Sequence, residues 1–178
     1  MDVIALAGQI GSGKSTLARA FAARNNHLYI GTGDFLRKLL AKSDSNYIER
    51  SKIQDFFINE FKNDWRLFCR TIFRDVSVKN SVIIVDSLRG IDSYYALCEY
   101  FVNSNVYVVY CDVDAETAAR RQLLRGDIAV ITKENSLNLR DFDDLSFFKE
   151  NADIVINMMN DFQQAIEELQ NWFILKGR

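Results

Sequence analysis

The sequence predicts an α/β fold in which a five-stranded parallel sheet is flanked by helices on both faces. Short apolar runs of strand length alternate along the chain with segments whose apolar residues have helical spacing. This alternation is typical of a parallel sheet, because the chain usually crosses between parallel strands through a helix. In addition, the first apolar run leads through a glycine-rich stretch directly into a helical pattern, and the 178 residues suit one domain with a full core.

Each predicted element corresponds to one such run or segment. We expect strands at residues 3–7, 28–30, 82–86, 106–111 and 153–157. We expect helices at residues 14–24, 34–42, 47–61, 65–78, 93–101, 115–125, 145–150 and 162–175. Ligands of such sheets bind at the carboxyl ends of the strands, so the functional residues should follow these strands.

Two long segments interrupt the alternation within the single domain 1–178. Residues 34–80 carry only helical patterns, and they are too long for a simple crossover between the second and third strands. We interpret them as a helical insert over the edge of the sheet. Residues 121–144 join an arginine-bearing helix end to a polar, irregular stretch, which we interpret as a mobile lid.

The stretch GQIGSGKS, which follows the first predicted strand, matches the phosphate-loop pattern G-x-x-x-x-G-K-[S/T]. Its glycines allow the backbone N–H groups to turn inward as an anion-binding nest at a helix N-terminus. Lys14 is placed to reach the β- and γ-phosphates of ATP, and the hydroxyl of Ser15 is placed to hold Mg²⁺. The ATP contacts that we expect come from Gly8, Gly11, Ser12, Gly13, Lys14, Ser15 and Thr16. The alternative is a glycine-rich turn that binds nothing.

Asp86 ends the apolar run VIIVD, at the carboxyl end of the third predicted strand. This position is close to where the phosphate loop should lie. An aspartate there is typical of a carboxylate that holds Mg²⁺ directly or through water. The alternative is an aspartate that caps the next turn.

The stretch YIGTGDFLRKLL places Asp34 and Arg37 one helical turn apart, just after the second predicted strand. In the functional interpretation, Arg37 binds a phosphate of the acceptor with two hydrogen bonds. Asp34 then orients or deprotonates the attacking group. In the alternative, Asp34 is an ordinary acid of a first helical turn and Arg37 is a solvated surface residue.

Three arginines fall in the predicted lid. Arg121 and Arg125 are four residues apart on one face of a helix, and Arg140 follows the polar stretch. Like charges at this spacing destabilise a helix slightly, a cost that makes sense if an anion bridges them. Phosphoryl transfer needs such charges to neutralise the transferred group. The alternative is an ordinary solvated basic face.

The composition excludes several other classes of function. The net charge of −2, from 22 basic and 24 acidic residues, lacks the excess of positive charge that non-specific nucleic-acid binding requires. We expect no membrane association, because no apolar run reaches transmembrane length and the N-terminus does not resemble a signal peptide. Three dispersed cysteines fit a reducing, cytoplasmic environment. The single histidine, His27, argues against a histidine-based metal site.

In their order along the chain, the blocks GQIGSGKS, TGDFLR, VDSLRG, R-x-x-x-RG and ADIVIN resemble the P-loop nucleoside monophosphate kinase superfamily. The resemblance implies the P-loop NTPase fold, with an insert at 34–80 that binds the acceptor and an arginine-bearing lid at 121–144. It places Asp86 and Arg89 on the family segment D-G-x-x-R, although Ser87 stands where the family has glycine. The catalytic residues that we expect are Lys14, Asp34, Arg121, Arg125 and Arg140, and the acceptor-binding residues are Asp34, Arg37 and Arg89.

These observations predict a kinase that uses ATP and Mg²⁺ and acts on a nucleotide-like small-molecule acceptor. A nucleoside or deoxynucleoside monophosphate is the first candidate acceptor, and dephospho-coenzyme A is the second. A nucleotide-dependent switch is a candidate from another class, but the guanine-reading motif N-K-x-D is absent from the sequence. A P-loop protein that binds nucleotide without turnover is the remaining alternative. We expect a monomer or homodimer.

Overall fold

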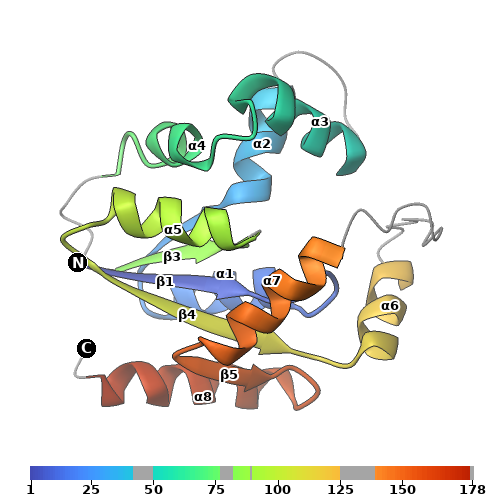
Figure 1. Cartoon of the computed structure of the whole chain (residues 1–178). Coiled ribbons are helices and arrows are strands. Elements are labelled where there is room, and N and C mark those ends of the chain that lie inside the picture. Colours follow the sequence, from blue (N-terminus) through green and yellow to red (C-terminus); the bar gives the residue numbers. More distant parts are fainter. Residues whose placement is uncertain (42–49, 77–81, 89, 125–138, 177–178) are drawn as a thin grey trace.

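A single parallel sheet forms the centre of the molecule (Figure 1). The computed structural model describes residues 1–41, 50–76, 82–88, 90–124 and 139–176. The strands are β1 (Asp2–Ala7), β2 (Leu28–Gly31), β3 (Val82–Asp86), β4 (Asn105–Asp112) and β5 (Ile154–Asn157). They lie in the order β2-β3-β1-β4-β5, and every neighbouring pair is parallel. The predicted sheet is confirmed, and the strand bounds shift by at most one residue.

The part of the chain that the structure describes contains eight helices around this sheet. They are α1 (Lys14–Arg24), α2 (Thr32–Ala41), α3 (Arg50–Phe61), α4 (Trp65–Ile72), α5 (Ile91–Tyr100), α6 (Ala115–Leu124), α7 (Leu139–Glu150) and α8 (Phe162–Leu175). None of them combines the length and the apolar character that a membrane span requires.

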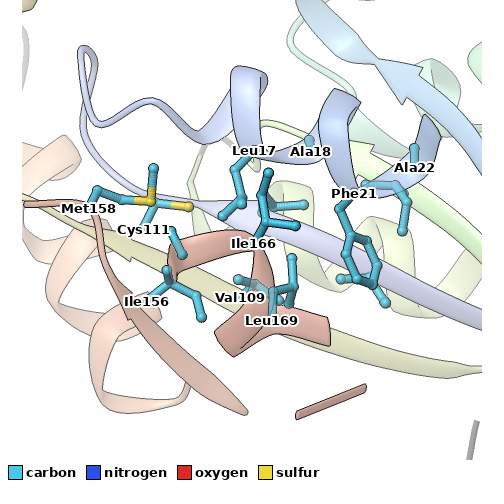
Figure 2. Close-up of a cluster of buried hydrophobic side chains, with 14 of the residues drawn as sticks. Leu17, Ala18, Phe21, Ala22, Val109, Cys111, Ile156, Met158, Ile166 and Leu169 are labelled. Carbon is cyan, nitrogen blue, oxygen red and sulfur yellow. The ribbon is translucent and has the colours of Figure 1, made fainter. Parts of the chain in front are cut away.

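Alternate residues of the central strand β1 face two separate cores. Ile4 and Leu6 pack with α1 and α8, while Val3 and Ala5 pack with α4, α5 and α7. Figure 2 shows the first of these cores, where Leu17 and Phe21 of α1 lie near side chains of β4, β5 and α8. All residues of β1 are buried, which is the expected state of a central parallel strand covered on both faces.

The predicted insert has an aromatic core of its own. Leu36 of α2, Ile53 and Phe57 of α3, and Phe68 of α4 are buried together there. The rings of Phe57 and Phe68 meet edge to face with their centroids 5.4 Å apart. In Figure 1 these three helices lie at the top of the molecule, on the side opposite α8. The insert is therefore a packed unit at the sheet edge.

The helix predicted at residues 65–78 was too long, since α4 ends at Ile72. Phe73 leaves the helical path because its buried ring packs against Phe101, with the centroids 5.0 Å apart. The hydroxyl of Tyr100 donates a hydrogen bond to the carbonyl oxygen of Phe73 at 3.1 Å. Tertiary partners thus replace the next helical turn.

The irregular stretch expected up to residue 144 is shorter at its C-terminal end, whereas the helix predicted at residues 115–125 is confirmed up to Leu124. Residues 121–124 finish α6, and α7 begins at Leu139 rather than at residue 145. Asp144 of α7 accepts a hydrogen bond from the backbone N–H of Ile91 at the start of α5, so tertiary contact supports this end of α7. Residues 125–138 lie outside the described part of the chain.

The half-buried ring of His27 should make stability depend on pH. His27 packs against Phe21 and Phe173, with centroids 5.8 Å and 5.5 Å away, and burial lowers its pKa. The unfolded chain therefore binds a proton at a higher pH than the folded chain. The stabilisation is fully present above the ordinary histidine pKa of about 6.5, and it is lost as the pH falls below that value.

We expect the free energy of unfolding to fall less between about pH 7 and about pH 5.5 in His27→Phe than in the wild type. Urea denaturation at both pH values measures this difference. The carboxylates common to both proteins cancel in the comparison. An equal fall in the two proteins would contradict the assignment.

Candidate functional site

The phosphate loop between β1 and α1 has a backbone that glycine alone accommodates at two points. Gly8 has φ +138°, and a Cβ there would lie 2.6 Å from the carbonyl oxygen of Cys111 in β4. Gly11 has φ +84°, and a Cβ there would collide with the carbonyl oxygen of Ala118 in α6. The backbone of the loop thus packs closely against β4 and α6, and these contacts fix the curvature of the loop.

Side-chain hydrogen bonds to backbone carbonyls hold the loop in this shape. The amide of Gln9 donates to the carbonyl oxygen of Val113 at 2.7 Å, and the amide of Gln122 donates to that of Ile10 at 3.0 Å. The Nζ atom of Lys14 donates to the carbonyl oxygen of Gln9 at 3.2 Å. Lys14 therefore reaches back across the concave side of its own loop, where a phosphate would bind.

Asp86 lies beside this loop, as the sequence predicted. It is buried, with 6% of its surface exposed, and it pairs with Leu6 across the β1–β3 ladder. Burial raises the pKa of Cys111 to about 12, while the charge of Lys14 lowers that pKa and the charge of Asp86 raises it. Both charges therefore act on the same sulfur atom at the end of β4.

The acceptor motif lies next to Asp86 on the other side. Tyr29 donates a hydrogen bond from its hydroxyl to Oδ2 of Asp86 at 3.0 Å, and the same hydroxyl is 3.4 Å from Oδ2 of Asp34. The hydroxyl of Thr32 donates to the backbone carbonyl oxygen of Asp86 at 3.1 Å. Burial, followed by the charge of Asp86, raises the pKa of Tyr29, so its hydroxyl stays protonated.

Asp34 binds two arginines, one at each carboxylate oxygen. Arg37 donates to Oδ1 at 2.9 Å, and Arg19 of α1 donates to Oδ2 at 2.5 Å. The predicted pair of Asp34 and Arg37 is therefore together in the structure. The sequence analysis missed Arg19 and Tyr29. The signal that could have identified them is that both are polar residues on elements that flank the phosphate loop and the acceptor motif.

The predicted lid arginines are placed unequally. Arg121 is bonded to backbone, since its guanidinium donates to the carbonyl oxygens of Ser12 at 3.2 Å and Met158 at 3.0 Å. Arg89 and Arg125 lie outside the described residues. Arg140 lies in the first turn of α7, and its side chain is likewise outside the description.

Arg121 borders a hollow of about 320 Å³ that adjoins the end of the phosphate loop at Gly13. This size is at the lower end of the range for small-molecule sites. Its lining combines apolar, amide and guanidinium groups from the loop, from α6 and from the chain after β5. The lining residues are Gly13, Thr16, Arg121, Leu124, Met158, Asn160 and Phe162.

The oxygen donors near the loop fit Mg²⁺ rather than a softer metal. Asp86 offers a carboxylate at the end of β3, and Ser15 offers a hydroxyl at the start of α1. Within the described ranges there is no group of three or more histidine, cysteine, aspartate or glutamate residues that could hold a metal ion. Mg²⁺ commonly binds through one or two carboxylates together with phosphates and water, so this sparse donor set suits it.

Ser87 adopts φ +77°, a left-handed conformation that is unfavourable for a residue with a side chain. Its hydroxyl donates a weak hydrogen bond to Oδ1 of Asp86 at 3.3 Å. We expect Ser87→Gly to be more stable than Ser87→Ala by up to about 1 kcal/mol, because only glycine relieves the strain while both variants lose the hydroxyl.

Thermal unfolding of the two variants measures this difference as a Tm higher by about 2–4 °C for Ser87→Gly. The Ser87→Ala variant is the control for the lost hydroxyl. Equal Tm values would mean that the backbone strain at this position is negligible.

Comparisons with known proteins agree with this geometry. A family model described as an AAA domain matches residues 4–140. The cytidylate kinase of Sulfurisphaera tokodaii is 28% identical over 193 aligned positions, which cover 98% of each chain. The shikimate kinase of Bacteroides thetaiotaomicron has the same fold, with a TM-score of 0.61 and 20% identity over 97% of this chain and 98% of that one.

The shikimate kinase of Acinetobacter baumannii, solved in complex with shikimate, superposes with a TM-score of 0.63 and 18% identity. That match covers 100% of this chain and 95% of that one. The chain therefore belongs to the AAA-domain family and to the P-loop nucleoside monophosphate kinase-like superfamily, and it is a phosphotransferase.

Proposed function

We propose that this kinase transfers the γ-phosphoryl group of ATP to a nucleoside or deoxynucleoside monophosphate, with Mg²⁺ at the phosphates. The observation that carries the proposal is the meeting of two sites at one edge of the sheet. The phosphate loop with Lys14 leaves β1 just after Leu6, which pairs with the buried Asp86, and the hydroxyl of Tyr29 joins Asp86 to Asp34 of the acceptor motif. In-line phosphoryl transfer needs such a juxtaposition of donor and acceptor.

The state of Asp34 favours a phosphate over a hydroxyl as the attacking group. A hydroxyl acceptor needs a general base with a lone pair directed at its proton. Both oxygens of Asp34 already accept hydrogen bonds from guanidinium groups. A phosphate acceptor needs no strong base, because it is already ionised at neutral pH. The similarity to a cytidylate kinase supports the same class of acceptor.

The chain's own residues have separate tasks in this proposal. Lys14 neutralises charge on the transferred phosphoryl group, and Ser15 and Asp86 hold Mg²⁺. The metal supplies charge neutralisation at the bridging phosphate oxygens when it is bound. The hydroxyl of Tyr29 fixes one oxygen of Asp86, which leaves the carboxylate in a single orientation.

The hollow beside Arg121 suits the base of the donor nucleotide. It adjoins Gly13 and Thr16 at the start of α1, and it combines apolar surface with amide and guanidinium donors. Arg121 is then a residue of the donor site rather than a mobile arm. Arg125 and Arg140 remain the candidate lid arginines, and Arg89 remains a candidate contact of the acceptor.

A screen for ADP release tests the proposal directly. The panel contains the ribo- and deoxyribonucleoside monophosphates together with dephospho-coenzyme A. Acceptor-dependent ADP release with one or more monophosphates is the expected result. Release with dephospho-coenzyme A alone would replace the monophosphate with a hydroxyl acceptor, and no release with any compound would indicate a binding protein.

We expect Lys14→Ala to abolish transfer while the fold stays intact. The variant loses the cation at the β- and γ-phosphates, so the barrier should rise by several kcal/mol, on the order of what one positioned electrostatic contact supplies. Single-turnover kinetics measure the loss, and thermal unfolding checks the fold. Lys52→Ala, at an exposed site on α3, is the control. Near-normal turnover in folded Lys14→Ala would contradict the assignment.

We expect Arg37→Ala to lower kcat/KM about ten- to a hundred-fold, because a charge-assisted pair with the acceptor phosphate is lost. Arg37→Lys should restore little of the lost activity, since an ammonium cannot make the two parallel hydrogen bonds of a planar guanidinium. Asp34→Asn should be the milder change. Steady-state kinetics with the best acceptor rank the three variants. The opposite order, with Asp34→Asn nearly inactive, would identify a hydroxyl acceptor.

A further inference from the structure

Two arginines converge on a single carboxylate at the acceptor end of the site. Arg19 of α1 and Arg37 of α2 lie at opposite oxygens of Asp34, at 2.5 Å and 2.9 Å. Arg37 belongs to the acceptor motif, whereas Arg19 comes from the helix that begins at the phosphate loop. The three side chains together carry a net charge of +1.

The positions of the two guanidinium groups leave them open to a ligand. The side chains of Arg19 and Arg37 are 55% and 53% exposed, and each donates to Asp34 through one nitrogen atom. A guanidinium has five N–H donors in a fixed plane. Donors therefore remain on both arginines for an anion with several acceptor oxygens.

Arg19 is held in place independently of Asp34. Its guanidinium carbon lies 5.3 Å from the centroid of the Tyr29 ring, a cation–π distance. Tyr29 is in turn anchored on Asp86 through its hydroxyl, at 3.0 Å. The side chain is therefore ordered before a ligand arrives, which reduces the entropy cost of binding.

Stability alone gives little reason for this arrangement. An exposed ion pair contributes little to folding, and a second arginine at the same carboxylate adds repulsion between like charges. The excess positive charge next to the phosphate loop is instead suited to an anionic ligand. A phosphate group can accept hydrogen bonds from both guanidinium groups through separate oxygen atoms.

We propose that Arg19 is an acceptor-binding residue, which forms with Arg37 a two-arginine site for the phosphate of the acceptor. Asp34 sets the spacing of the two guanidinium groups, and Tyr29 orients that of Arg19. This inference rests on the proposed function, because it assigns the acceptor of that reaction an anionic reacting end. It adds the donor-loop helix α1 to the acceptor site.

Calorimetric titration of the full chain tests the assignment. The probe is the nucleoside monophosphate that gives the fastest ADP release in the screen, titrated without donor. We expect Arg19→Gln to raise its Kd about ten-fold, as for loss of one charge-assisted contact, and to leave the Kd for ATP unchanged. Arg24→Gln, at an exposed site in the last turn of the same helix, is the matched control and should bind as the wild type does.

The corresponding nucleoside, which lacks the phosphate, separates anion binding from a structural role. Its Kd should be the same in the wild type and in Arg19→Gln. If Arg19→Gln weakens the nucleoside and the monophosphate equally, Arg19 only anchors α2 and the inference is wrong. Should Arg19→Gln fail to fold, Arg19→Lys takes its place, and a weaker but monophosphate-specific loss supports the assignment while wild-type affinity overturns it.

The two proposals can fail separately. If the wild type releases ADP with a monophosphate while Arg19→Gln binds that monophosphate as tightly as the wild type does, the assignment of Arg19 is wrong and the proposed function stands. If the wild type uses no monophosphate at all, both are overturned.

Discussion

The alignment of three parallel strands at Asp86 positions everything else in the candidate site. Asp86 pairs with Leu6 of β1 on one side and with Gly31 of β2 on the other. Leu6 lies two residues before the phosphate loop begins, and Gly31 lies three residues before Asp34. Donor loop, candidate metal carboxylate and acceptor motif therefore leave the sheet at one level. A slip of one residue in either ladder would turn the side chains of that strand to the opposite face.

A chain of hydrogen bonds links Asp86, the acceptor motif and helix α1. The hydroxyl of Tyr29 lies between the carboxylates of Asp86 and Asp34, and Arg19 and Arg37 balance the second of these charges. Gly31 makes this approach possible, because a Cβ there would lie 2.7 Å from both Oδ2 of Asp34 and the hydroxyl of Tyr29. Because Gly31 has no side chain, the carboxylates and the arginines can lie close together at the end of β2.

The helical insert is tied to this arrangement through shared packing. Its aromatic core is separate from the two cores that cover the sheet, yet Trp65 and Ile72 of α4 contact both the insert core and the core of β1 and β3. Arg66 of α4 also binds Glu99 of α5 with two hydrogen bonds at 2.6 Å and 2.9 Å. The acceptor side of the site therefore rests on helices that are anchored to the sheet.

The sequence by itself determined the strands and their succession along the chain, the phosphate loop and the place of Asp86, because these follow from local patterns of apolar and glycine residues. It also placed Asp34 and Arg37 together, since one helical turn separates them. Only the tertiary structure decided that Arg19 binds Asp34, that Arg121 binds backbone carbonyls and that α7 begins at Leu139. These features join residues that are distant in the sequence or depend on packing between elements. The spatial order of the strands, β2-β3-β1-β4-β5, is also a tertiary feature, because it depends on burial of both faces of the sheet and leaves no local signal at the residues themselves.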